Sequence, residues 1–448
     1  MGIKGKKVLI IGYSLTGRKS AEYFAKQSAD VYITEFKEKN KQDKEDIQNL
    51  LNKGIKIEFG GHSDEFLKGA VFALISPSIK DDASVLSRID CPVYSDIEYT
   101  GKNLNMEDKI ILITGTNGKT TTTMLTSFIL SQKFDAPFAG NIGVPPLEIL
   151  TDRTPDYLVI EASSYQLHHS KKLSPKIAVL CNITPDHIAW HNGLAGYIKD
   201  KTDILKRMSK DSFVILNYDD PFTKTFEREI KANVYYFSLN KIDYENCCYL
   251  DNGSIYFQNE EIIKTDEISL KGNHNYQNVM ASIIVSKLIG LSNEIIKEGV
   301  KNFKAPAHRL EFIVKIGHIS YYNDSKATNV EASNVAINAF PDKKVALIAG
   351  GRDKNTPLDE FVSYIKKRIN KVVLIGEAKD RFKEALLNKG FDNIKETKTL
   401  EEAVDEAEKG NPDIVLFSPA CASFDMFDNF EARGECFREY VTKKIPAR

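Results

Sequence analysis

Short apolar runs rich in β-branched residues recur along the chain, and most of them end at a glycine or a polar residue. Runs of this length predict strands buried on both faces of a sheet. Amphipathic stretches such as Arg18–Lys26 lie between them and predict helices. This alternation predicts an α/β fold with parallel sheets. The runs are Val8–Ile11, Val31–Thr34, Phe72–Ile75, Ile110–Ile113, Tyr157–Ile160, Ile177–Leu180, Phe213–Leu216, Val234–Phe237, Ile319–Asn323, Val345–Ala349, Val372–Ile375 and Ile414–Phe417.

The length of the chain and its polar breaks predict three such units. The chain has 448 residues, and ordinary domains average about 150 residues. The polar stretch Thr100–Lys109 and the proline-containing stretch Phe303–His308 are typical of linkers. We therefore expect domains at 1–103, 104–307 and 308–448. An alanine- and isoleucine-rich helix is predicted over Val279–Leu288.

Composition and charge exclude several classes of partner. Hydrophobic residues make up 42% of the chain and charged residues 27%, as in soluble globular proteins. The 61 basic and 62 acidic residues leave a net charge of -1, so no overall field favours nucleic acid or an anionic membrane. No apolar run is long enough for a secretory leader or a membrane span, so we expect a cytoplasmic protein, and we expect a monomer.

The six cysteines show no metal-binding or redox spacing, which favours reduced thiols. Cys421, within Ser418–Ser423, has the surroundings of either a nucleophile or a packed small residue. No base lies near it in the sequence, which favours packing.

A glycine-rich loop follows the apolar run Ile110–Ile113 and precedes the helix-like stretch Met124–Leu130. Strand, glycine loop and helix in this order can cradle a phosphate with backbone N–H groups. Lys119 would add a charge at the β- and γ-phosphates, and the hydroxyl of Thr120 or Thr121 would hold Mg²⁺. Ile113 stands where the longer form of the motif has its first glycine. The alternative is a simple strand-to-helix turn.

The chain begins with a strand, a helix and a strand, in the layout of a Rossmann nucleotide unit. The first turn reads Gly12-Tyr-Ser-Leu-Thr-Gly17, and Glu35 closes the second strand. Ser14 replaces the glycine that lets a pyrophosphate approach. A nucleotide site of an unusual kind and a purely structural turn both remain open.

Polar residues follow the next strands of the central unit. Glu161 is placed to share a Mg²⁺ with Thr120, or else is a solvated acid at a strand end. His187 is a second-metal candidate or a structural histidine beside Trp190. The spacing of Lys199 and Lys201 favours a solvated lysine face.

The third unit places a polar turn, Asp324-Ser-Lys326-Ala-Thr328-Asn329, between a strand and a helix. Asp324 or Asn329 would either cap that helix or take part in catalysis. The turn at Arg352–Lys354 and Ser423 are further polar strand ends that would suit an anionic substrate.

Eight motifs occur in the order shown by the Mur ligases, which the chain resembles over essentially its whole length. They are Gly115–Thr121, Glu161–Gln166, Asp186–His187, His274–Asn278, His308–Arg309, Asp324–Asn329, Ser418–Ser423 and Asn429–Gly434. The resemblance implies a Rossmann-like N-terminal domain for a uridine nucleotide, a central P-loop ATPase-type α/β domain and a Rossmann-like C-terminal domain for an amino acid. The last motifs most resemble the members of that family that join D-glutamate to UDP-N-acetylmuramoyl-L-alanine through an acyl phosphate, with release of ADP and phosphate.

The resemblance also implies roles for individual residues. It implies catalytic roles for Lys119, Glu161, His187 and Lys201, with Thr120, Glu161, His187 and a carbamylated Lys201 holding two Mg²⁺ ions. It places ATP at Gly115, Thr116, Asn117, Gly118, Lys119, Thr120, Thr121, Asn275, Asn278, Arg309 and Asp324. It places uridine near Leu15, Thr16 and Glu35, the muramoyl group at Asn141, Ser163 and Gln166, and D-glutamate at Lys326, Thr328, Lys354, Ser423 and Phe430.

Three positions depart from the family pattern. Ser14 and Ser78 stand where glycines are usual, which affects the uridine contacts, and Ala189 stands where an aspartate is common near the second metal. Another Mur ligase and a folate-type polyglutamyl ligase are the enzyme alternatives. A nucleotide-binding regulator without turnover is the alternative from another class.

Overall fold

The computed structural model describes the chain apart from residues 1, 39–43, 78, 82, 186, 187, 189, 305, 306, 341, 342, 354–357 and 446–448. The predictions for His187 and Lys354, and the departures at Ser78 and Ala189, lie outside the described residues. The chain divides into two compact units, Met1–Phe303 and Lys304–Arg448.

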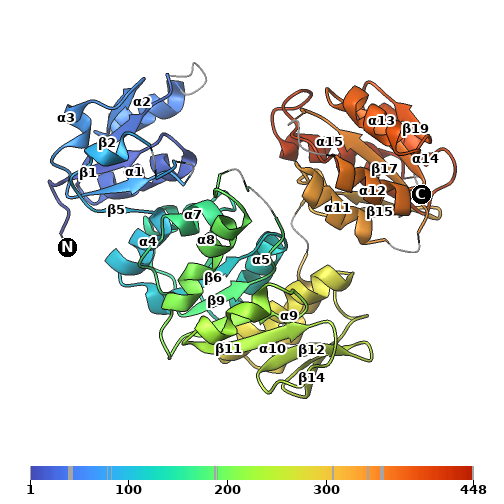
Figure 1. Cartoon of the computed structure of the whole chain (residues 1–448), viewed down its shortest axis with the longest axis horizontal. Coiled ribbons are helices and arrows are strands. Elements are labelled where there is room, and N and C mark those ends of the chain that lie inside the picture. The colour runs from blue at the N-terminus through green and yellow to red at the C-terminus, as the bar shows by residue number, and fades with distance from the viewer. Residues whose placement is uncertain are drawn as a thin grey trace. The chain divides into compact units, whose positions relative to one another are not determined.

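The first unit begins with a five-stranded parallel sheet of order β3-β2-β1-β4-β5, drawn in blue in Figure 1. Its strands are β1 (Lys7–Ile11), β2 (Asp30–Glu35), β3 (Lys56–Phe59), β4 (Phe72–Ile75) and β5 (Val93–Tyr94), and its helices are α1 (Leu15–Lys26), α2 (Lys44–Asn52) and α3 (Asp64–Leu67). Burial of the apolar run explains the central place of β1, since Val8 to Ile11 are at most 1% exposed. Gly12 follows β1, Ser76 follows β4 and Glu35 ends β2, so all three lie at the carboxyl ends of neighbouring strands.

The second sheet has nine strands in the order β14-β13-β12-β11-β10-β9-β6-β8-β7. They are β6 (Ile110–Thr114), β7 (Phe138–Gly140), β8 (Leu158–Glu161), β9 (Ile177–Leu180), β10 (Phe213–Asn217), β11 (Asn233–Ser238), β12 (Cys247–Asp251), β13 (Ser254–Phe257) and β14 (Glu260–Lys264). β12, β13 and β14 pair antiparallel, and the other neighbours pair parallel. The carboxyl ends of β6, β8 and β9 meet at one edge, which is where open α/β sheets bind ligands.

Helices pack around this second sheet. They are α4 (Asp96–Glu98), α5 (Lys119–Leu130), α6 (Pro146–Leu150), α7 (Ser164–His168), α8 (Leu194–Arg207), α9 (Asn273–Leu288) and α10 (Asn293–Asn302). Short 3-10 helical segments span Leu86–Arg88, Glu107–Lys109 and Thr223–Glu229. The sequence analysis placed the first residue of α9 too late in the chain. The helix already starts at Asn273, after Gly272, and its polar first turns face the glycine-rich loop described below.

The predicted linker at Thr100–Lys109 is partly packed, and its role between two domains stays a prediction. A π-helical turn spans Tyr99–Asn103, and Thr100 is fully buried. A side chain at Gly101 would place its Cβ 2.3 Å from a methyl of Leu173. This close approach packs the stretch against Leu173, a residue of the core of the second sheet, which polarity in the sequence did not indicate.

The second unit holds a six-stranded sheet of order β15-β16-β20-β17-β18-β19, drawn in orange and red in Figure 1. Its strands are β15 (Glu311–Ile316), β16 (Ile319–Asn323), β17 (Val345–Gly350), β18 (Lys371–Ile375), β19 (Ile394–Glu396) and β20 (Ile414–Phe417). Its helices are α11 (Val330–Asn338), α12 (Asp359–Arg368), α13 (Lys379–Asn388), α14 (Leu400–Glu408) and α15 (Phe430–Lys443). β15 pairs antiparallel with β16, and the remaining pairs are parallel.

Three mixed or parallel sheets with connecting helices confirm the predicted α/β fold class. Among the described residues, no helix combines the length and the apolar character needed to cross a membrane.

Candidate active site

The glycine-rich loop lies between β6 and α5 and is braced from the end of β9. Asn182 accepts the N–H of Asn117 at 2.8 Å through its side chain and the N–H of Thr116 at 3.0 Å through its carbonyl oxygen. Gly115 has φ 144°, and a Cβ there would lie 2.9 Å from Cys181. Glycine is therefore required by both the backbone angle and the space.

A second glycine brings α9 against the loop. Gly118 caps α5 with φ 81°, and a Cβ on it would lie 2.4 Å from Oδ1 of Asn278. The same Oδ1 accepts the hydroxyl of Thr122 at 3.1 Å, and Asn278 donates to Asn275 at 3.3 Å. The two asparagines predicted for ATP thus contact each other, and one of them contacts the loop.

Oxygen and amide groups converge where α5 meets the end of β8. The hydroxyl of Thr120 donates to Glu161 Oε2 at 2.6 Å, and Asn141 Nδ2 donates to Oε1 at 3.0 Å. Glu161 is only 2% exposed, which argues against a solvated strand-end acid. Hydroxyl and carboxylate oxygens are ligands that Mg²⁺ accepts, so this pair suits a magnesium ion. Lys119 lies within the same loop and donates to the carbonyl of Thr116 at 2.7 Å.

The structure separates the two lysines that spacing assigned to one solvated face. Lys199 is exposed, whereas Lys201 on α8 is 2% exposed, so the solvated interpretation is wrong for Lys201. Its amine donates to the carbonyl of Gly115 at 2.7 Å and lies 5.0 Å from the ring centroid of Tyr197. Tyr197 in turn contacts Thr116 at 2.8 Å. Lys201 therefore directly contacts the glycine-rich loop, which is called the phosphate loop from here on.

Ser163 and Gln166, predicted for the muramoyl group, form a capping box at the start of α7. The hydroxyl of Ser163 accepts the N–H of Gln166 at 3.2 Å, and Gln166 Oε1 accepts the N–H of Ser163 at 3.0 Å. Both residues lie within five positions after Glu161, so the box orients the turn beyond the carboxylate.

Sequence reasoning missed a buried histidine next to this turn. His191 contacts Asp200 at 2.6 Å through Nδ1 and Ser164 at 2.9 Å through Nε2. Asp200 precedes Lys201 on α8, so the contact positions the helix that carries the lysine. The signal available in the sequence was His191 next to the single Trp190. Only the fold brings His168 and His169 to the same tryptophan.

A hollow of about 570 Å³ lies at the strand ends of the first sheet. Glu35, one of its lining residues, accepts the N–H groups of Tyr13 at 2.8 Å and Lys37 at 3.0 Å. Ser14, which replaces the expected glycine, caps α1 and contacts Ser76 at 2.8 Å. Phe36, 74% exposed, adds an apolar surface to the lining. Leu15 and Thr16 begin α1 next to the lining residue Ser14.

Asp324 lies at the end of β16 in the second unit and is 6% exposed. Its carboxyl accepts the hydroxyl of Ser418 at 2.6 Å and the N–H of Leu310 at 3.0 Å. Burial raises the pKa of Asp324 to about 7, and these hydrogen bonds, with the nearby charge of Arg309, oppose the rise. Asn329, and not Asp324, caps α11.

Arg433, which sequence reasoning did not single out, holds the surrounding loops together. Its buried guanidinium donates to Ser325 O at 2.7 Å, to Cys421 O at 3.0 Å and to Ala422 O at 3.1 Å. Burial lowers the pKa of Arg433 to about 10. The signal available in the sequence was an arginine next to a glycine within a stretch that has the pattern of an amphipathic helix.

The residues predicted for the amino acid lie on these loops. Lys326 Nζ is 5.5 Å from the ring centroid of Phe430, and the N–H of Thr328 donates to the carbonyl of Lys326 at 2.8 Å. Ser423 is 1% exposed in the loop after β20. Cys421 in the same loop is buried, and burial raises the pKa of its thiol to about 12. This confirms the packed interpretation of Cys421, and all six cysteines are free thiols.

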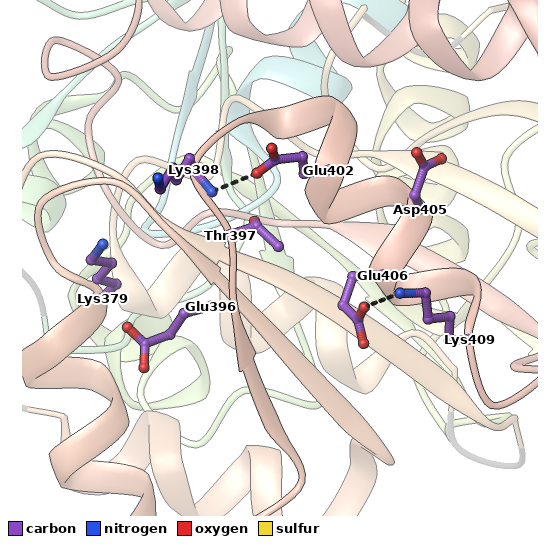
Figure 2. Close-up of a pocket in the computed structure, with 8 residues that line it drawn as sticks. All are labelled: Lys379, Glu396, Thr397, Lys398, Glu402, Asp405, Glu406 and Lys409. Carbon is purple, nitrogen blue, oxygen red and sulfur yellow. Dashed lines mark hydrogen bonds and ion pairs between the residues drawn. The ribbon is translucent and has the colours of Figure 1, made fainter.

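A second hollow, of about 560 Å³, lies on the second unit and contains none of the predicted residues (Figure 2). Its charges compensate one another. Glu406 pairs with Lys409 at 2.6 Å and with Lys371 at 2.7 Å, and Asp405 pairs with Lys444 at 2.5 Å. It therefore offers no concentrated charge to a ligand, unlike the loop at β6.

Comparison with known proteins gives the family. Residues 113–286 match the family model of the Mur ligase middle domain, and residues 308–421 match that of the Mur ligase glutamate ligase domain. The UDP-N-acetylmuramoylalanine–D-glutamate ligase of Caldicellulosiruptor bescii is 37% identical over 99% of both chains. The ligase of the same name from Streptococcus thermophilus is 37% identical over 98% of this chain and 97% of its own.

Solved structures share the fold at lower identity. The UDP-N-acetylmuramate-alanine ligase of Thermotoga maritima has a TM-score of 0.62 at 17% identity and covers 98% of this chain and 99% of its own. A folylpolyglutamate synthase of Mycobacterium tuberculosis has a TM-score of 0.56 at 15% identity over 76% of this chain and 94% of its own. The near-complete match to relatives at 37% identity confirms the resemblance, and the chain belongs to the Mur ligase family.

Proposed function

We propose that this chain is an ATP-dependent ligase that joins D-glutamate to UDP-N-acetylmuramoyl-L-alanine in peptidoglycan precursor synthesis. The observation that carries the proposal is the full-length match at 36–37% identity to ligases named for this reaction. The folate-type alternative has only a shared fold at 15% identity in its favour. We further propose that the enzyme is a cytoplasmic monomer built from domains at 1–103, 104–307 and 308–448.

The reaction proceeds in two steps. A carboxylate oxygen of the nucleotide-linked substrate attacks the γ-phosphorus of ATP, and the bond from that phosphorus to the bridging oxygen breaks to release ADP. The amine of D-glutamate then attacks the acyl carbon, loses a proton, and displaces phosphate.

The central loop supplies the phosphate-binding part of this chemistry. The N–H groups from Gly118 to Thr121 cradle the β- and γ-phosphates at the start of the helix, while those of Thr116 and Asn117 donate to Asn182 and hold the shape of the loop. Lys119 places its ammonium group beside the transferring phosphoryl group, where it stabilises the charge of the transition state. The contact of Asn278 with Gly118 supports an adenine-side role for Asn275 and Asn278.

The proposal includes two Mg²⁺ ions beside this loop, and the donors Thr120 and Glu161 support the first of them. Thr120 and Glu161 would hold the first, and His187 with a carbamate on Lys201 would hold the second. These residues would hold Mg²⁺ where its charge could offset that of the phosphates and polarise the γ-phosphoryl group. The 2.6 Å contact of Thr120 with Glu161 supports the first assignment.

The Thr120→Val variant tests the first magnesium site. It removes one ligand, and we expect the Mg²⁺ concentration needed for half-maximal activity to rise about tenfold or more. Thr123→Val is the matched control on the same helix, since Thr123 Oγ1 has no hydrogen-bond partner among the described residues. An equal Mg²⁺ dependence in both variants would remove Thr120 from the site.

Carbamylation of Lys201 is supported by its burial next to the loop. The neutral amine attacks the carbon of CO₂, a C–O π bond opens to an anionic oxygen, and one proton leaves the nitrogen. Burial disfavours a charged ammonium and so favours the neutral amine that this step needs. The product replaces a cation with carboxylate-like oxygens, which are metal ligands.

The Lys201→Ala variant tests this role. We expect it to lose activity that a short added carboxylate such as acetate or propionate partly restores. Lys199→Ala, on the exposed face of the same helix, serves as the control and keeps full activity. Undiminished turnover of Lys201→Ala would overturn the carbamate role.

The remaining predicted residues divide between the two organic substrates. The hollow at the first sheet, with Glu35 in its lining and Leu15 and Thr16 beside it, takes the uridine nucleotide. Asn141, Ser163 and Gln166 take the muramoyl group. Arg309 and Asp324 serve ATP, and the D-glutamate side chain is bound by Lys326, Thr328, Lys354, Ser423 and Phe430.

Phosphate release by the purified protein tests the overall proposal. We expect release from ATP only when both UDP-N-acetylmuramoyl-L-alanine and D-glutamate are present. Release with L-alanine or a diamino acid instead would move the chain to another Mur ligase. No release from the native protein, matching an inert Glu161→Ala variant, would favour the non-catalytic nucleotide-binding regulator.

A further inference from the structure

Three potential metal ligands meet away from the phosphate loop, within the first unit. Asp81 follows β4 of the first sheet, His168 ends α7, and His169 follows it. His168 Nε2 lies 3.0 Å from Asp81 Oδ2, and His169 Nδ1 lies 3.9 Å from Asp81 Oδ1. One ligand atom from each residue lies within 4.8 Å of the others.

Each histidine already uses its other ring nitrogen. His169 Nε2 is 2.8 Å from the carbonyl oxygen of Ile79, and His168 Nδ1 is 2.9 Å from Asp200 Oδ1. A carbonyl oxygen only accepts, so His169 carries its proton on Nε2 and keeps a lone pair on Nδ1. Donation to Asp200 likewise leaves the lone pair of a neutral His168 on Nε2.

This pattern is that of metal-binding histidines. Such residues almost always donate their second ring N–H to a carboxylate or a backbone carbonyl, which fixes the tautomer and the ring orientation. Both kinds of acceptor are present here, one for each ring. Two lone pairs and a carboxylate then face the same point, and a bound cation removes their mutual repulsion.

The spacing also suits a tetrahedral ion. Ligand atoms around tetrahedral zinc lie about 3.4 Å apart, given metal–ligand distances of about 2.0–2.2 Å. The contacts of 3.0 Å to Oδ2 and 3.9 Å to Oδ1 of Asp81 lie on either side of this value, and one ligand atom from each of the three residues lies within 4.8 Å of the others. Two imidazoles and one carboxylate favour a borderline-soft ion over Mg²⁺.

We propose that Asp81, His168 and His169 bind one divalent transition-metal ion, of which zinc fits best, with water completing a tetrahedron. Two cations compete with the metal. One is the proton of His168 itself, since the hydrogen bond to Asp200 and the charges of Asp200 and Asp81 raise the pKa of His168. The other is Lys171, whose Nζ lies 3.9 Å from Asp81 Oδ2. Both of those side chains are at least 60% exposed, and exposed ion pairs contribute little.

The bound ion links two parts of the first unit. Asp81 lies in the segment that follows β4 of the first sheet, whereas the histidines belong to the central part that carries the phosphate loop. Ile79, whose carbonyl orients His169, lines the hollow at the strand ends. The ion therefore secures the segment that walls this hollow. The site stands independently of the proposed ligase reaction.

Cobalt binding to the full-length, chelator-treated protein tests the site. With excess Mg²⁺ present to fill oxygen-rich sites, we expect one Co²⁺ with the strong visible absorption of tetrahedral coordination, displaced by Zn²⁺. The spectrum should lack the near-ultraviolet band of thiolate-bound cobalt, which separates this site from the cysteines. The proposal is wrong if the bound Co²⁺ shows only the weak absorption of octahedral coordination and if Mg²⁺ displaces it.

Three variants locate the ion. Asp81→Ala and His169→Gln should each weaken Co²⁺ binding at least tenfold, since loss even of an outer partner costs about 10–100-fold in affinity. His318→Gln, which removes an exposed histidine of the second unit, should bind as the native protein does. Unchanged binding by Asp81→Ala would overturn the assignment.

Thermal unfolding gives a second measurement. Zn²⁺ should raise the midpoint of the native protein and of His318→Gln, because a ligand that binds only the folded state stabilises it. It should not raise the midpoint of Asp81→Ala. Asp81 is exposed, so this variant keeps the fold even if His169→Gln does not. An equal shift in the native protein and Asp81→Ala would contradict the proposal.

Discussion

The phosphate loop and the loops around Arg433 are both polar clusters at the ends of parallel strands, but they use charge differently. At the phosphate loop, Lys119 and Lys201 donate to backbone carbonyls of the loop itself. In the second unit, the buried Asp324 and Arg433 have pKa values displaced toward neutrality, and burial is the first cause of both shifts. The most perturbed charges of the second unit therefore organise loops, and a displaced pKa alone does not identify a substrate contact.

This difference predicts which property of the protein each substitution changes. Changes at the phosphate loop should reduce turnover and leave the fold intact. Changes at Arg433 should reduce the stability of the second unit.

Arg433→Met should have the largest effect. It leaves the carbonyl oxygens of Ser325, Cys421 and Ala422 without their buried donor. We expect the free energy of unfolding of the second unit to fall by about 3–5 kcal/mol, measured by hydrogen exchange in β17 and β20 under denaturant. Arg438→Met is the control on the same helix. Its partly exposed pair with Glu311 predicts a loss of less than about 1 kcal/mol, and equal losses would contradict the comparison.

Lys119→Met should reduce the maximal rate of phosphate release by about 10²–10³-fold, because it removes the positive charge beside the transferring group. The thermal midpoint should stay within a few degrees of the native value. Lys133→Met, an exposed lysine just beyond α5, should retain native turnover. If Lys119→Met lowers the rate only because the protein is less stable, the contrast between the phosphate loop and the loops around Arg433 is wrong.

Asp324 should make stability depend on pH. Its pKa is about 7 in the folded chain against an ordinary value of 3.8, so between these values the folded state keeps a proton that the unfolded state has lost. The free energy of unfolding should fall as pH rises from about 4 to about 7, by up to about 1.4 kcal/mol per pH unit from this group. Denaturant titrations should show that Asp324→Asn lacks this component.

Ser418→Ala sharpens the same test. Its hydroxyl favours the charged form of Asp324, so its removal should extend the decline to higher pH. A pH dependence identical in the native protein and Asp324→Asn would show that burial of this carboxyl has no such effect.

Thr123→Val should have the smallest effect. The buried hydroxyl has no hydrogen-bond partner among the described residues, so an isosteric methyl group removes a polar group that burial disfavours. We expect the free energy of unfolding to stay unchanged or rise by up to about 1 kcal/mol, measured by denaturant unfolding. A loss of several kcal/mol would reveal an interaction at Thr123 that the contacts do not account for.

Much of the fold follows from local pattern. The run Ile110–Ile113 lies within the interior strand β6, and the stretches at Phe213 and Val234 form β10 and β11 of the same sheet, because continuous apolar runs suit strands covered on both faces. The late start predicted for α9 and the packed stretch at Thr100 have another origin. Their polar residues are ordered by tertiary contacts with Gly118 and Leu173, which local pattern does not encode.

The candidate site also contains residues that local pattern identifies and residues that it does not. The loop Gly115–Thr120 and the strand-end Glu161 carry recognisable local chemistry. The burial of Lys201 and the bonds of Arg433 depend on residues far away in the chain, as does the contact of Asp81 with His168. Spacing alone treats Lys201 like its exposed neighbour Lys199, and only the packing of α8 against the phosphate loop separates them.

The most direct test of the proposed reaction follows oxygen from the substrate carboxylate. UDP-N-acetylmuramoyl-L-alanine labelled with ¹⁸O in its terminal carboxylate is incubated with the native protein, ATP, Mg²⁺ and D-glutamate, and the released phosphate is analysed by mass spectrometry. An acyl phosphate formed at the loop predicts one ¹⁸O atom in each released phosphate. Phosphate released without the label, while the amide product forms, would contradict the account.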